Sequence, residues 1–519
     1  MDADMDRTLK VPHRTYSTTL DEQLEQLKTD ELLQRFAASR QRLSSDPHRP
    51  HYHYVNPEGN LNDPNGLCYW QGRYHLFYQA YPPEDTRQHW GHAWSEDLVH
   101  WKDLPLAIYP GPEDKCFSGT TLVEDDRVIA IYHGIDQGTM LAISSDPLLL
   151  NWEKLTGKAV IADLEADDMG RPYRVFDPCI WKEEDGYYAL TGGYRDGPIF
   201  ENCLMTQFLH FSQDLKRWNY LGHFIENDIF TAPGEDGAVP YFWPIGDKHI
   251  LIFASHQRGS QYLLGDYDKV RNRFRATSHG RFNFGALRHG GVHAPSATPD
   301  GEGGIFLIHN VNHGKETEGW NHVMSLVRHL TLADDGTLAI EPVSAIEAQR
   351  CDHQQVGETP LPAGEEIVLQ GIEGNAIELA VRLDPGNARE VRLDVLRSPD
   401  AEEHTSIRFL KNGGFSWTGG DYRAQLDALV IDHSRGSLAS NLLARPPEVA
   451  PFQLQEGEEL DLRIFIDKSI IELFANGRQV MGLRVYPDRQ DSVGVSARAF
   501  GSDAVLRSLD AWQMRSLYD

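Results

Sequence analysis

Five short segments of the chain repeat one pattern, a turn followed by a strand of apolar residues. The segments are GRYHLFYQA from Gly72, DRVIAIYHG from Asp126, GYYALTGG from Gly186, DKHILIFAS from Asp247 and GIFLIHNV from Gly304. Their starts lie 54, 60, 61 and 57 residues apart. Self-similarity at a fixed period of this length is typical of repeat architectures. This part of the chain is therefore expected to contain five copies of one structural unit.

A second element of the repeat follows three of these segments. The stretches SEDLVHWKDL, SSDPLLLNWEKL and SQDLKRWNYL place Trp101, Trp152 and Trp218 in matching positions. A unit of about 55 residues with several strands, recurring five times, predicts a five-bladed β-propeller. A β-sandwich of similar length is the alternative, but it does not explain so long a fixed period. In a propeller, the inner strands of all blades surround one central channel, where motifs distant in sequence can meet.

The rest of the chain predicts an all-β protein with a short helical start. Apolar residues at helical spacing predict an amphipathic helix within 19–43, which we expect to pack on the main domain. Beyond the last repeat, short apolar strands alternate with turns, and the Asn-Gly pair at 476–477 is a strong hairpin signal. The predicted domains are a helical extension (1–45), the propeller (46–345), a linker (346–364) and a β-sandwich (365–519).

Composition excludes several classes of function. The chain of 519 residues has 49 Lys plus Arg against 77 Asp plus Glu, and a net charge of −28 opposes binding to nucleic acid or anionic lipid. No stretch approaches the roughly 18 apolar residues of a membrane helix, and the N-terminus lacks the pattern of a signal peptide. The five cysteines are widely spaced (Cys68, Cys116, Cys179, Cys203 and Cys351). They indicate a reducing compartment, so we expect a cytoplasmic protein, with a secreted mature form as the alternative.

Three carboxylates stand out in the propeller. Asp63 lies in the turn NDPNG, Asp177 in FDP, and Glu235 between glycine residues in GEDGAVPYFWP. An Asp-Pro pair alone is an ordinary turn signal. Carboxylates at equivalent points of successive blades, however, would meet in the channel and drive their pKa values apart, which provides an ionised nucleophile beside a protonated acid. Glycoside hydrolysis uses that arrangement, and Trp90 and Trp243 would suit the apolar faces of sugar rings.

Several motifs together resemble those of glycoside hydrolase family 32, which includes invertases, levanases, inulinases and fructosyltransferases. The motifs are NDPNG, FYQ, WGHAWSEDLVHW, FSGT, GWNHVMSLVRHLTL and DKSIIELFANG. The resemblance extends from about residue 51 to residue 519. It implies a five-bladed propeller followed by a β-sandwich, in agreement with the repeat, and a substrate such as sucrose or a fructan.

The resemblance also implies roles for individual residues. Asp63 would be the nucleophile that attacks the anomeric carbon of a β-fructofuranosyl unit, Glu235 the general acid, and Asp177 the residue that holds sugar hydroxyls. The remaining residues would bind the fructosyl unit: Asn62, Gln79, Trp90, Phe117, Ser118, Arg174 and Asp236. Of the neighbours Glu235 and Asp236, only one is expected to face the channel, because adjacent residues of an extended segment point to opposite sides.

Two motifs depart from the pattern of the family. Phe176 occupies the place of an arginine that usually precedes the second aspartate, and Arg174 lies two residues earlier. The third motif, GEDGAVPYFWP around Glu235, has three extra residues before the shared strand PIGDKH. The pocket floor should therefore differ from that of a plain invertase.

Three further interpretations remain open from the sequence. A fructosyltransferase would pass the fructosyl unit to a sugar hydroxyl in place of water. A binding protein without catalysis would retain the fold but not the chemistry. A metal site among the histidines of HYHY and HWGH lacks a carboxylate or thiolate at ligand spacing, so we expect neither a metal nor a cofactor. The leading hypothesis is a retaining hydrolase of β-fructofuranosides.

Overall fold

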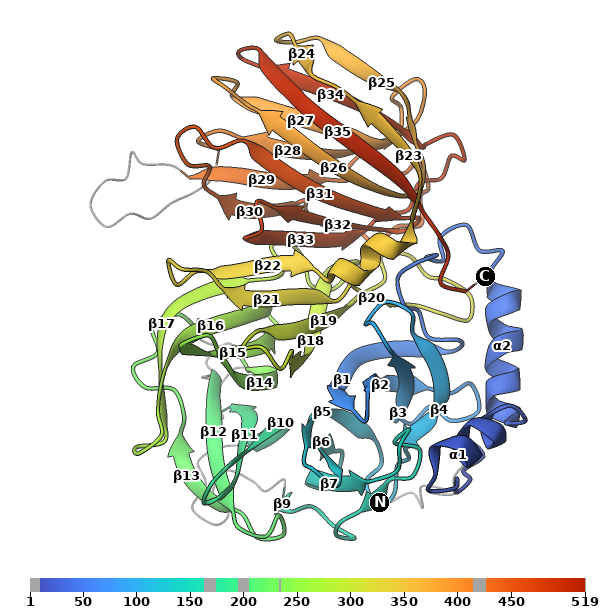
Figure 1. Ribbon diagram of the computed structural model, residues 1–519, viewed down its shortest axis with the longest axis vertical. Coiled ribbons are helices and arrows are strands. Elements are labelled where there is room, and N and C mark those ends of the chain that lie inside the picture. Colours follow the sequence, from blue (N-terminus) through green and yellow to red (C-terminus); the bar gives the residue numbers. More distant parts are fainter. Residues whose placement is uncertain (1–9, 163–173, 195–204, 233–234, 414–425, 519) are drawn as a thin grey trace.

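The computed structural model has two β domains stacked end to end, with two helices on one side (Figure 1). It describes residues 10–162, 174–194, 205–232, 235–413 and 426–518. The lower domain in Figure 1 is a ring of small sheets, and the upper domain consists of two larger sheets. The predicted all-β fold, a propeller followed by a sandwich, is confirmed.

Five antiparallel sheets, which we call blades 1 to 5, form the propeller. Blade 1 contains β1 (Asn60–Trp70), β2 (Arg73–Tyr81), β3 (His89–Ser95) and β4 (Lys102–Ile108). Blade 2 contains β5 (Cys116–Val123), β6 (Val128–Gly134), β7 (Gly138–Ser144), β8 (Glu153–Lys154) and β9 (Ile161–Ala162). Blade 3 contains β10 (Arg174–Glu183), β11 (Gly186–Tyr194), β12 (Met205–Ser212) and β13 (Asn219–His223).

Blades 4 and 5 complete the ring. Blade 4 contains β14 (Ala238–Ile245), β15 (Lys248–Ser255), β16 (Gly259–Asp268) and β17 (Arg273–Arg281). Blade 5 contains β18 (Val292–Pro299), β19 (Ile305–Val311), β20 (Val323–Met324), β21 (Arg328–Leu332) and β22 (Leu338–Pro342). The inner strands are β1, β5, β10, β14 and β18, and each packs against the next around the ring, with β18 returning to β1.

The tryptophan repeat corresponds to one recurring turn. The leucine three residues before each tryptophan has a positive φ: 67° at Leu98, 51° at Leu149 and 64° at Leu215. The indole groups of Trp152 and Trp218 donate to the carbonyl oxygens of Leu149 and Leu215 at 2.8 and 3.0 Å. Non-glycine residues seldom adopt such φ values, so three occurrences at matching positions identify the same turn in three blades.

The second domain is a sandwich of two antiparallel sheets. One sheet contains β23 (Arg350–Val356), β24 (Thr359–Leu361), β26 (Ala376–Asp384), β31 (Leu460–Asp467), β32 (Ile470–Ala475), β33 (Gln479–Arg484) and β35 (Ala504–Met514). The other contains β25 (Glu366–Glu373), β27 (Glu390–Arg397), β28 (Thr405–Leu410), β29 (Asp427–Asp432), β30 (Glu448–Phe452) and β34 (Gly494–Phe500). Buried aliphatic residues of both sheets form one core.

The predicted linker at 346–364 is part of the sandwich. A 3₁₀ helix, Ser344–Gln349, leads directly into β23, and both β23 and β24 pair with β35. These edge strands expose polar side chains such as Gln354 and Gln355, so they lack the apolar alternation by which strands are recognised. The Asn-Gly hairpin signal is confirmed: Asn476 and Gly477 have φ values of 46° and 62° in the turn between β32 and β33.

The single helix predicted within 19–43 is two helices, α1 (Leu20–Leu27) and α2 (Glu31–Leu43). Asp30 separates them because its carboxylate accepts from the N–H groups of Leu32 and Leu33 at 3.0 and 3.1 Å, which caps the start of α2. Leu32 and Phe36 join the core of the propeller. The helices therefore pack on the main domain, as expected.

Buried ion pairs join the two domains. The Asp467 carboxylate, at the end of β31, accepts from the N–H groups of Tyr52 and His53 at 2.7 and 2.9 Å and from His53 Nδ1 at 2.9 Å. His53 Nε2 lies 3.2 Å from Glu472 of β32, which also accepts from Arg328 Nη2 of blade 5 at 2.9 Å. His53, the second histidine of the HYHY segment, thus binds carboxylates of the sandwich.

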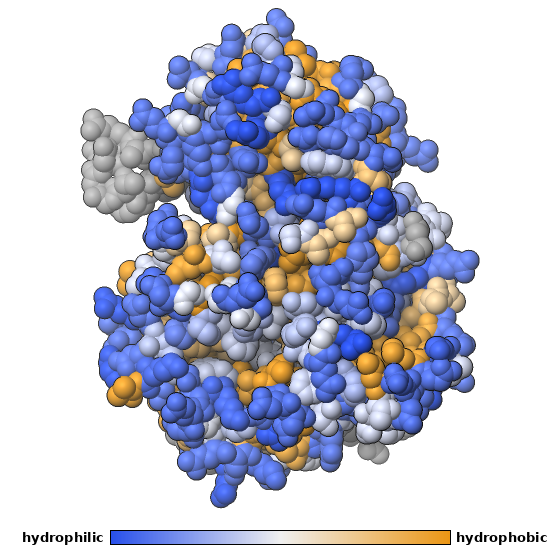
Figure 2. Space-filling view, viewed as in Figure 1, coloured by the Kyte–Doolittle hydropathy of each residue, from blue (hydrophilic) through white to orange (hydrophobic). Residues whose placement is uncertain are grey.

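The surface is mostly hydrophilic, with hydrophobic residues scattered over both domains (Figure 2). No helix in the described part of the chain has the length and apolar character needed to cross a lipid bilayer. Cys68, Cys116, Cys179 and Cys351 are free thiols, and Cys203 lies outside the described residues.

Candidate active site

All five inner strands bulge at the same end, and the bulges define the site. Regular pairing is interrupted around 62–63 in β1, 117–118 in β5, 177 in β10, 239–240 in β14 and 293–294 in β18. A bulge bends its strand and redirects a side chain, and bulges are common beside active sites. Each blade thus turns one or two side chains toward the channel, and all five blades do so at the same height along the channel axis.

A cavity of about 600 Å³ opens at this level, a size typical of sites for small ligands. It is lined by Asn62, Asp63, Gln79, Tyr81, Gln88, Phe117, Ser118, His133, Phe176, Asp177, Asp236, Ala238, Val239, Ala254, His256, Arg288 and His293. Seven of the ten predicted site residues are in this set: Asn62, Asp63, Gln79, Phe117, Ser118, Asp177 and Asp236. Trp90, Arg174 and Glu235 are not.

Gly66 allows the turn NDPNG to fit at the channel. Its φ is 50°, and a Cβ atom there would lie 2.7 Å from Thr121 Cγ2 and 3.3 Å from the Trp90 ring. A larger residue would therefore be strained both in its backbone and against blade 2. This close approach holds Asp63 at the mouth of the channel.

Asp63 is held as an ionised carboxylate. Ser118 Oγ donates to Asp63 Oδ2 at 2.6 Å and accepts from Gln79 Nε2 at 2.7 Å, while His293 Nδ1 lies 3.5 Å from Asp63 Oδ1. Burial raises the pKa of the Asp63 carboxyl, but the close approach and charge of His293 and the hydrogen bond from Ser118 outweigh burial and hold this pKa below its ordinary value. Asp63 can therefore act as a nucleophile at neutral pH.

Asp177 has the opposite electrostatic environment. It shares the cavity with Asp63, and its Oδ2 accepts from the Val239 N–H at 3.3 Å. Burial, together with the negative charge of Asp63, raises the pKa of Asp177 to about 7. The two carboxyl groups are therefore driven apart in proton affinity, as the sequence predicts for acids gathered in one channel.

Asp236, rather than Glu235, is the third carboxylate of the cavity. Glu235 is fully buried outside it and accepts from Arg258 Nε, Gln261 Nε2 and the Ala232 N–H, each at 2.6 Å. Burial raises the pKa of Glu235, but these partners lower it below its ordinary value. The structure thus places Asp236 at the cavity and Glu235 on the other side of the segment, where Arg258 holds it.

Two histidines that sequence reasoning missed also line the cavity. His256 follows β15, and both its backbone N–H and its Nδ1 are bonded to the Asp236 carboxylate. His293 lies in the bulge of β18, and its ring centroid is 5.8 Å from that of His256. The hydrogen bond and charge of Asp236 raise the pKa of His256 to about 9, although burial opposes this effect. At neutral pH the cavity therefore contains an imidazolium beside its carboxylates.

A hydrogen-bonded row forms the side of the cavity next to Asp63. Asn62 Nδ2 and Gln88 Nε2 donate to Gln79 Oε1 at 2.9 and 2.8 Å. Trp90 lies behind this row, fully buried, and its indole N–H donates to the Phe117 carbonyl oxygen at 2.9 Å. Trp90 therefore supports the pocket from behind without lining it.

Arg174 is the first residue of β10, and its side chain lies outside the described part of the structure.

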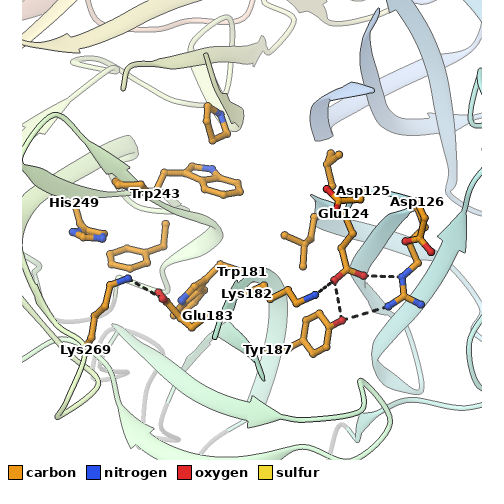
Figure 3. A pocket seen from close by; sticks show the side chains of 16 residues that line it. Glu124, Asp125, Asp126, Trp181, Lys182, Glu183, Tyr187, Trp243, His249 and Lys269 are labelled. Carbon is orange, nitrogen blue, oxygen red and sulfur yellow. Dashed lines mark hydrogen bonds and ion pairs between the residues drawn. The ribbon is translucent and has the colours of Figure 1, made fainter. Parts of the chain in front are cut away.

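A larger cavity, of about 940 Å³, lies at the opposite end of the same inner strands (Figure 3). Its lining includes Val123 of β5, Glu183 of β10 and Trp243 of β14, so Trp243 lines this cavity and not the smaller one. An eight-residue strand spans roughly 25 Å. Figure 3 shows Glu124 joined to Lys182 and Tyr187. Because these charges are paired across blades 2 and 3, we place the chemistry in the smaller cavity.

The described residues contain no group of three or more His, Cys, Asp or Glu side chains arranged to hold a metal ion.

Comparison with protein families assigns both domains. Residues 53–342 match the model for the N-terminal domain of glycosyl hydrolases family 32, and residues 343–513 match the model for the C-terminal domain of the same family.

Curated relatives and solved structures agree with this match. Sucrose-6-phosphate hydrolase of Escherichia coli is 28% identical over 512 residues, covering 90% of this chain and 94% of that protein. Levanase of Bacillus subtilis is 27% identical, covering 91% of this chain and 71% of that protein. The structure of fructan 1-exohydrolase IIa from Cichorium intybus superposes with a TM-score of 0.77 at 24% identity, covering 91% and 98% of the two chains. That of sucrose-6-phosphate hydrolase from Lactobacillus gasseri gives 0.74 at 24% identity, covering 94% and 98%.

Proposed function

Because this chain belongs to glycoside hydrolase family 32 and is a β-fructofuranosidase, we propose how its residues divide the work of hydrolysis. Asp63 attacks the anomeric carbon of the fructosyl unit and forms a covalent intermediate, which water then cleaves. Asp177 accepts hydrogen bonds from sugar hydroxyls, and its negative charge stabilises the oxocarbenium-like transition state. Both residues project from bulges into one cavity.

The observation that carries these assignments is the contrast between the two carboxyl groups. The pKa of Asp63 is held below its ordinary value, while that of Asp177 is raised to about 7 in the same cavity. The nucleophile of a retaining glycosidase must be ionised before attack. Asp63, fixed by Ser118 and flanked by His293, meets that condition.

The charges around the cavity favour a neutral substrate. The lining contains three carboxylates, Asp63, Asp177 and Asp236, against the imidazolium of His256 and Arg288, which is the sole Lys or Arg among the described lining residues. A phosphate group is usually held by several donors, among them bidentate arginines. We therefore infer that unphosphorylated fructosides such as sucrose, levan or inulin are preferred over sucrose 6-phosphate.

One assay tests both the function and the substrate class. The purified protein is incubated with sucrose, sucrose 6-phosphate, inulin and levan, and the products are identified over a range of substrate concentrations. We expect free fructose from a neutral substrate, with kcat/KM at least about tenfold above that for sucrose 6-phosphate. Longer oligosaccharides at high substrate concentration would identify transfer in place of hydrolysis. Absence of any released sugar would contradict the proposal and favour a binding protein.

A further inference from the structure

Blade 4 lacks an acid at the position where other blades provide one. The residue before the bulge proline is Asp63 in β1 and Asp177 in β10, but Val239 in β14. Its neighbour Ala238 is equally apolar, and both line the cavity. The polar groups on this side come instead from Asp236, in the preceding loop, and from His256, just after β15.

Asp236 and His256 form a fixed pair. Asp236 Oδ1 accepts from the His256 backbone N–H at 3.0 Å, and Asp236 Oδ2 is bonded to His256 Nδ1. The Asp236 side chain is 8% exposed, whereas that of His256 is 45% exposed. Among the described residues, His256 Nε2 has no hydrogen-bond partner, so this nitrogen is available to a ligand. An aspartate on one ring nitrogen that leaves the other free is the arrangement of a histidine acid–base catalyst.

We propose that His256 is the general acid and base of this enzyme and that Asp236 is its positioning residue. The inference rests on the proposed function, because it assumes that Asp63 is the nucleophile.

Asp63, His256 and one water molecule suffice for both steps of hydrolysis. As Asp63 bonds to the anomeric carbon, the bond from that carbon to the leaving oxygen breaks, and the oxygen takes its electron pair and the proton from His256 Nε2. His256 is then neutral. A water molecule next gives a proton to His256 Nε2 and bonds to the anomeric carbon, which releases the Asp63 carboxylate. The imidazolium is thereby restored for the next cycle.

The charges around His256 suit both steps. Asp236 has the largest effect in raising its pKa to about 9, and Asp177 and Asp63 add to it, while Arg288 and His293 also line the cavity. His256 is therefore protonated when substrate binds. Formation of the intermediate removes the charge of Asp63 and lowers the pKa of His256, because part of the shift comes from that charge. The imidazole is then better suited to accept a proton from water.

Two carboxyl groups compete for this role. Glu235 is excluded by position, since it is buried outside the cavity and paired with Arg258. Asp177 lies in the cavity with a pKa of about 7. The pH profile separates the two candidates, because the alkaline limb of kcat/KM reports the acid of the free enzyme. We expect this limb near pH 9 for His256, and an acid at Asp177 would place it near pH 7.

The test compares two substrates in three variants of the full-length protein. Sucrose has a leaving group that needs protonation, whereas p-nitrophenyl β-fructofuranoside has one that does not. We expect His256→Gln to lower kcat/KM for sucrose by at least about a hundredfold, to change kcat/KM for the aryl fructoside less than about tenfold, and to lose the alkaline limb. Added azide should raise its turnover of the aryl fructoside by replacing water in the second step.

The other two variants separate positioning from general damage. Asp236→Asn should show the same dependence on leaving group with a smaller loss, and its alkaline limb should move to lower pH because the pKa of His256 falls. Glu235→Gln is the matched control and should affect both substrates equally, without moving the limb. Far-ultraviolet circular dichroism checks that each variant is folded.

The outcomes distinguish the inference from the function on which it rests. If the wild-type protein releases fructose from sucrose but His256→Gln loses activity equally on both substrates, or keeps the alkaline limb, His256 is not the acid. An alkaline limb near pH 7 that disappears in Asp177→Asn would assign the role to Asp177. Only a wild-type protein that releases no fructose from sucrose, inulin, levan or the aryl fructoside would refute the proposed function itself.

Discussion

The domain interface predicts a large effect from one conservative substitution, Asp467→Asn. Asp467 is fully buried and accepts four hydrogen bonds at 2.6 to 2.9 Å: from the N–H groups of His51, Tyr52 and His53, and from His53 Nδ1. Asparagine presents one acceptor oxygen and one donor NH₂ group, so part of this set of donors would face another donor. Breaking a buried charge pair costs about 3–5 kcal/mol. We expect that loss in the free energy of unfolding.

The same pair predicts a dependence on pH. Burial alone would lower the pKa of His53, but hydrogen bonds and charges from Asp467 and Glu472 raise it from 6.5 to about 9. A raised pKa in the folded state stabilises the protein fully below pH 6.5, and this stabilisation is lost as pH rises through 9. At 1.36 kcal/mol per unit, this pKa difference corresponds to roughly 3 kcal/mol. In Asp467→Asn, the free energy of unfolding should fall less between pH 6.5 and 9 than it does in the wild type.

Urea unfolding between pH 6 and 10, followed by tryptophan fluorescence and circular dichroism, measures both effects. The matched control is Asp510→Asn, because Asp510 Oδ1 pairs with His353 Nε2 at 2.7 Å in the same sheet but at a half-exposed site. Exposed pairs contribute about 0–1 kcal/mol, so this variant should resemble the wild type. If Asp467→Asn is within about 1 kcal/mol of the wild type at pH 6, or retains its full pH dependence, the reasoning is wrong.

Three other outcomes are expected. Asp63→Asn should lower kcat by at least about a thousandfold because the attacking group is lost, with an unchanged circular dichroism spectrum; a thermally destabilised variant that keeps its activity would identify a turn residue, and Asp125→Asn at the opposite cavity is the control. Asp30→Ala should lower stability by at least about 1 kcal/mol through loss of the α2 cap and of the buried hydrogen bond from the Tyr16 hydroxyl at 2.7 Å, seen as faster proteolysis near residue 30, whereas Asp21→Ala in α1 should not. Residues 1–345 alone should be insoluble or inactive, since Glu472 and Asp467 would be missing from the interface; full activity of this fragment would contradict that expectation.

The repeat allowed most of the fold to be predicted. A period of about 55 residues can be read because every blade contains the same turn and buried strand, the second strand of its sheet. The edge strands β23 and β24 could not be read in this way, since their polar side chains face solvent and their pairing to β35 is a long-range contact. The break at Asp30 was readable in principle, because an aspartate just before a helical turn is a cap signal.

The site was predicted only where its residues lie in a recognisable motif. Asp63 and Asp177 each precede a proline, and the structure shows that a proline also lies at the bulges of β14 and β18: Pro240 within the first and Pro295 directly after the second. Aligning the inner strands on these prolines would have placed Glu235 before the bulge of β14 and would have drawn attention to His293. His256 had no such signal, because it follows β15 and reaches the cavity through blade packing.

The bulges also explain how this site can differ from the motifs expected of its family. A bulge is set by the backbone and by the proline or glycine beside it, so the cavity keeps its shape whichever side chain occupies the turned position. In β14 those positions are apolar, and the polar groups come instead from the loop before β14 and the turn after β15. Since Ala238 pairs with Ala254, two residues before His256, the end of β15 lies beside the bulge. A proton donor can therefore be supplied from the turn after the second strand of blade 4 without any change in the positions of Asp63 and Asp177.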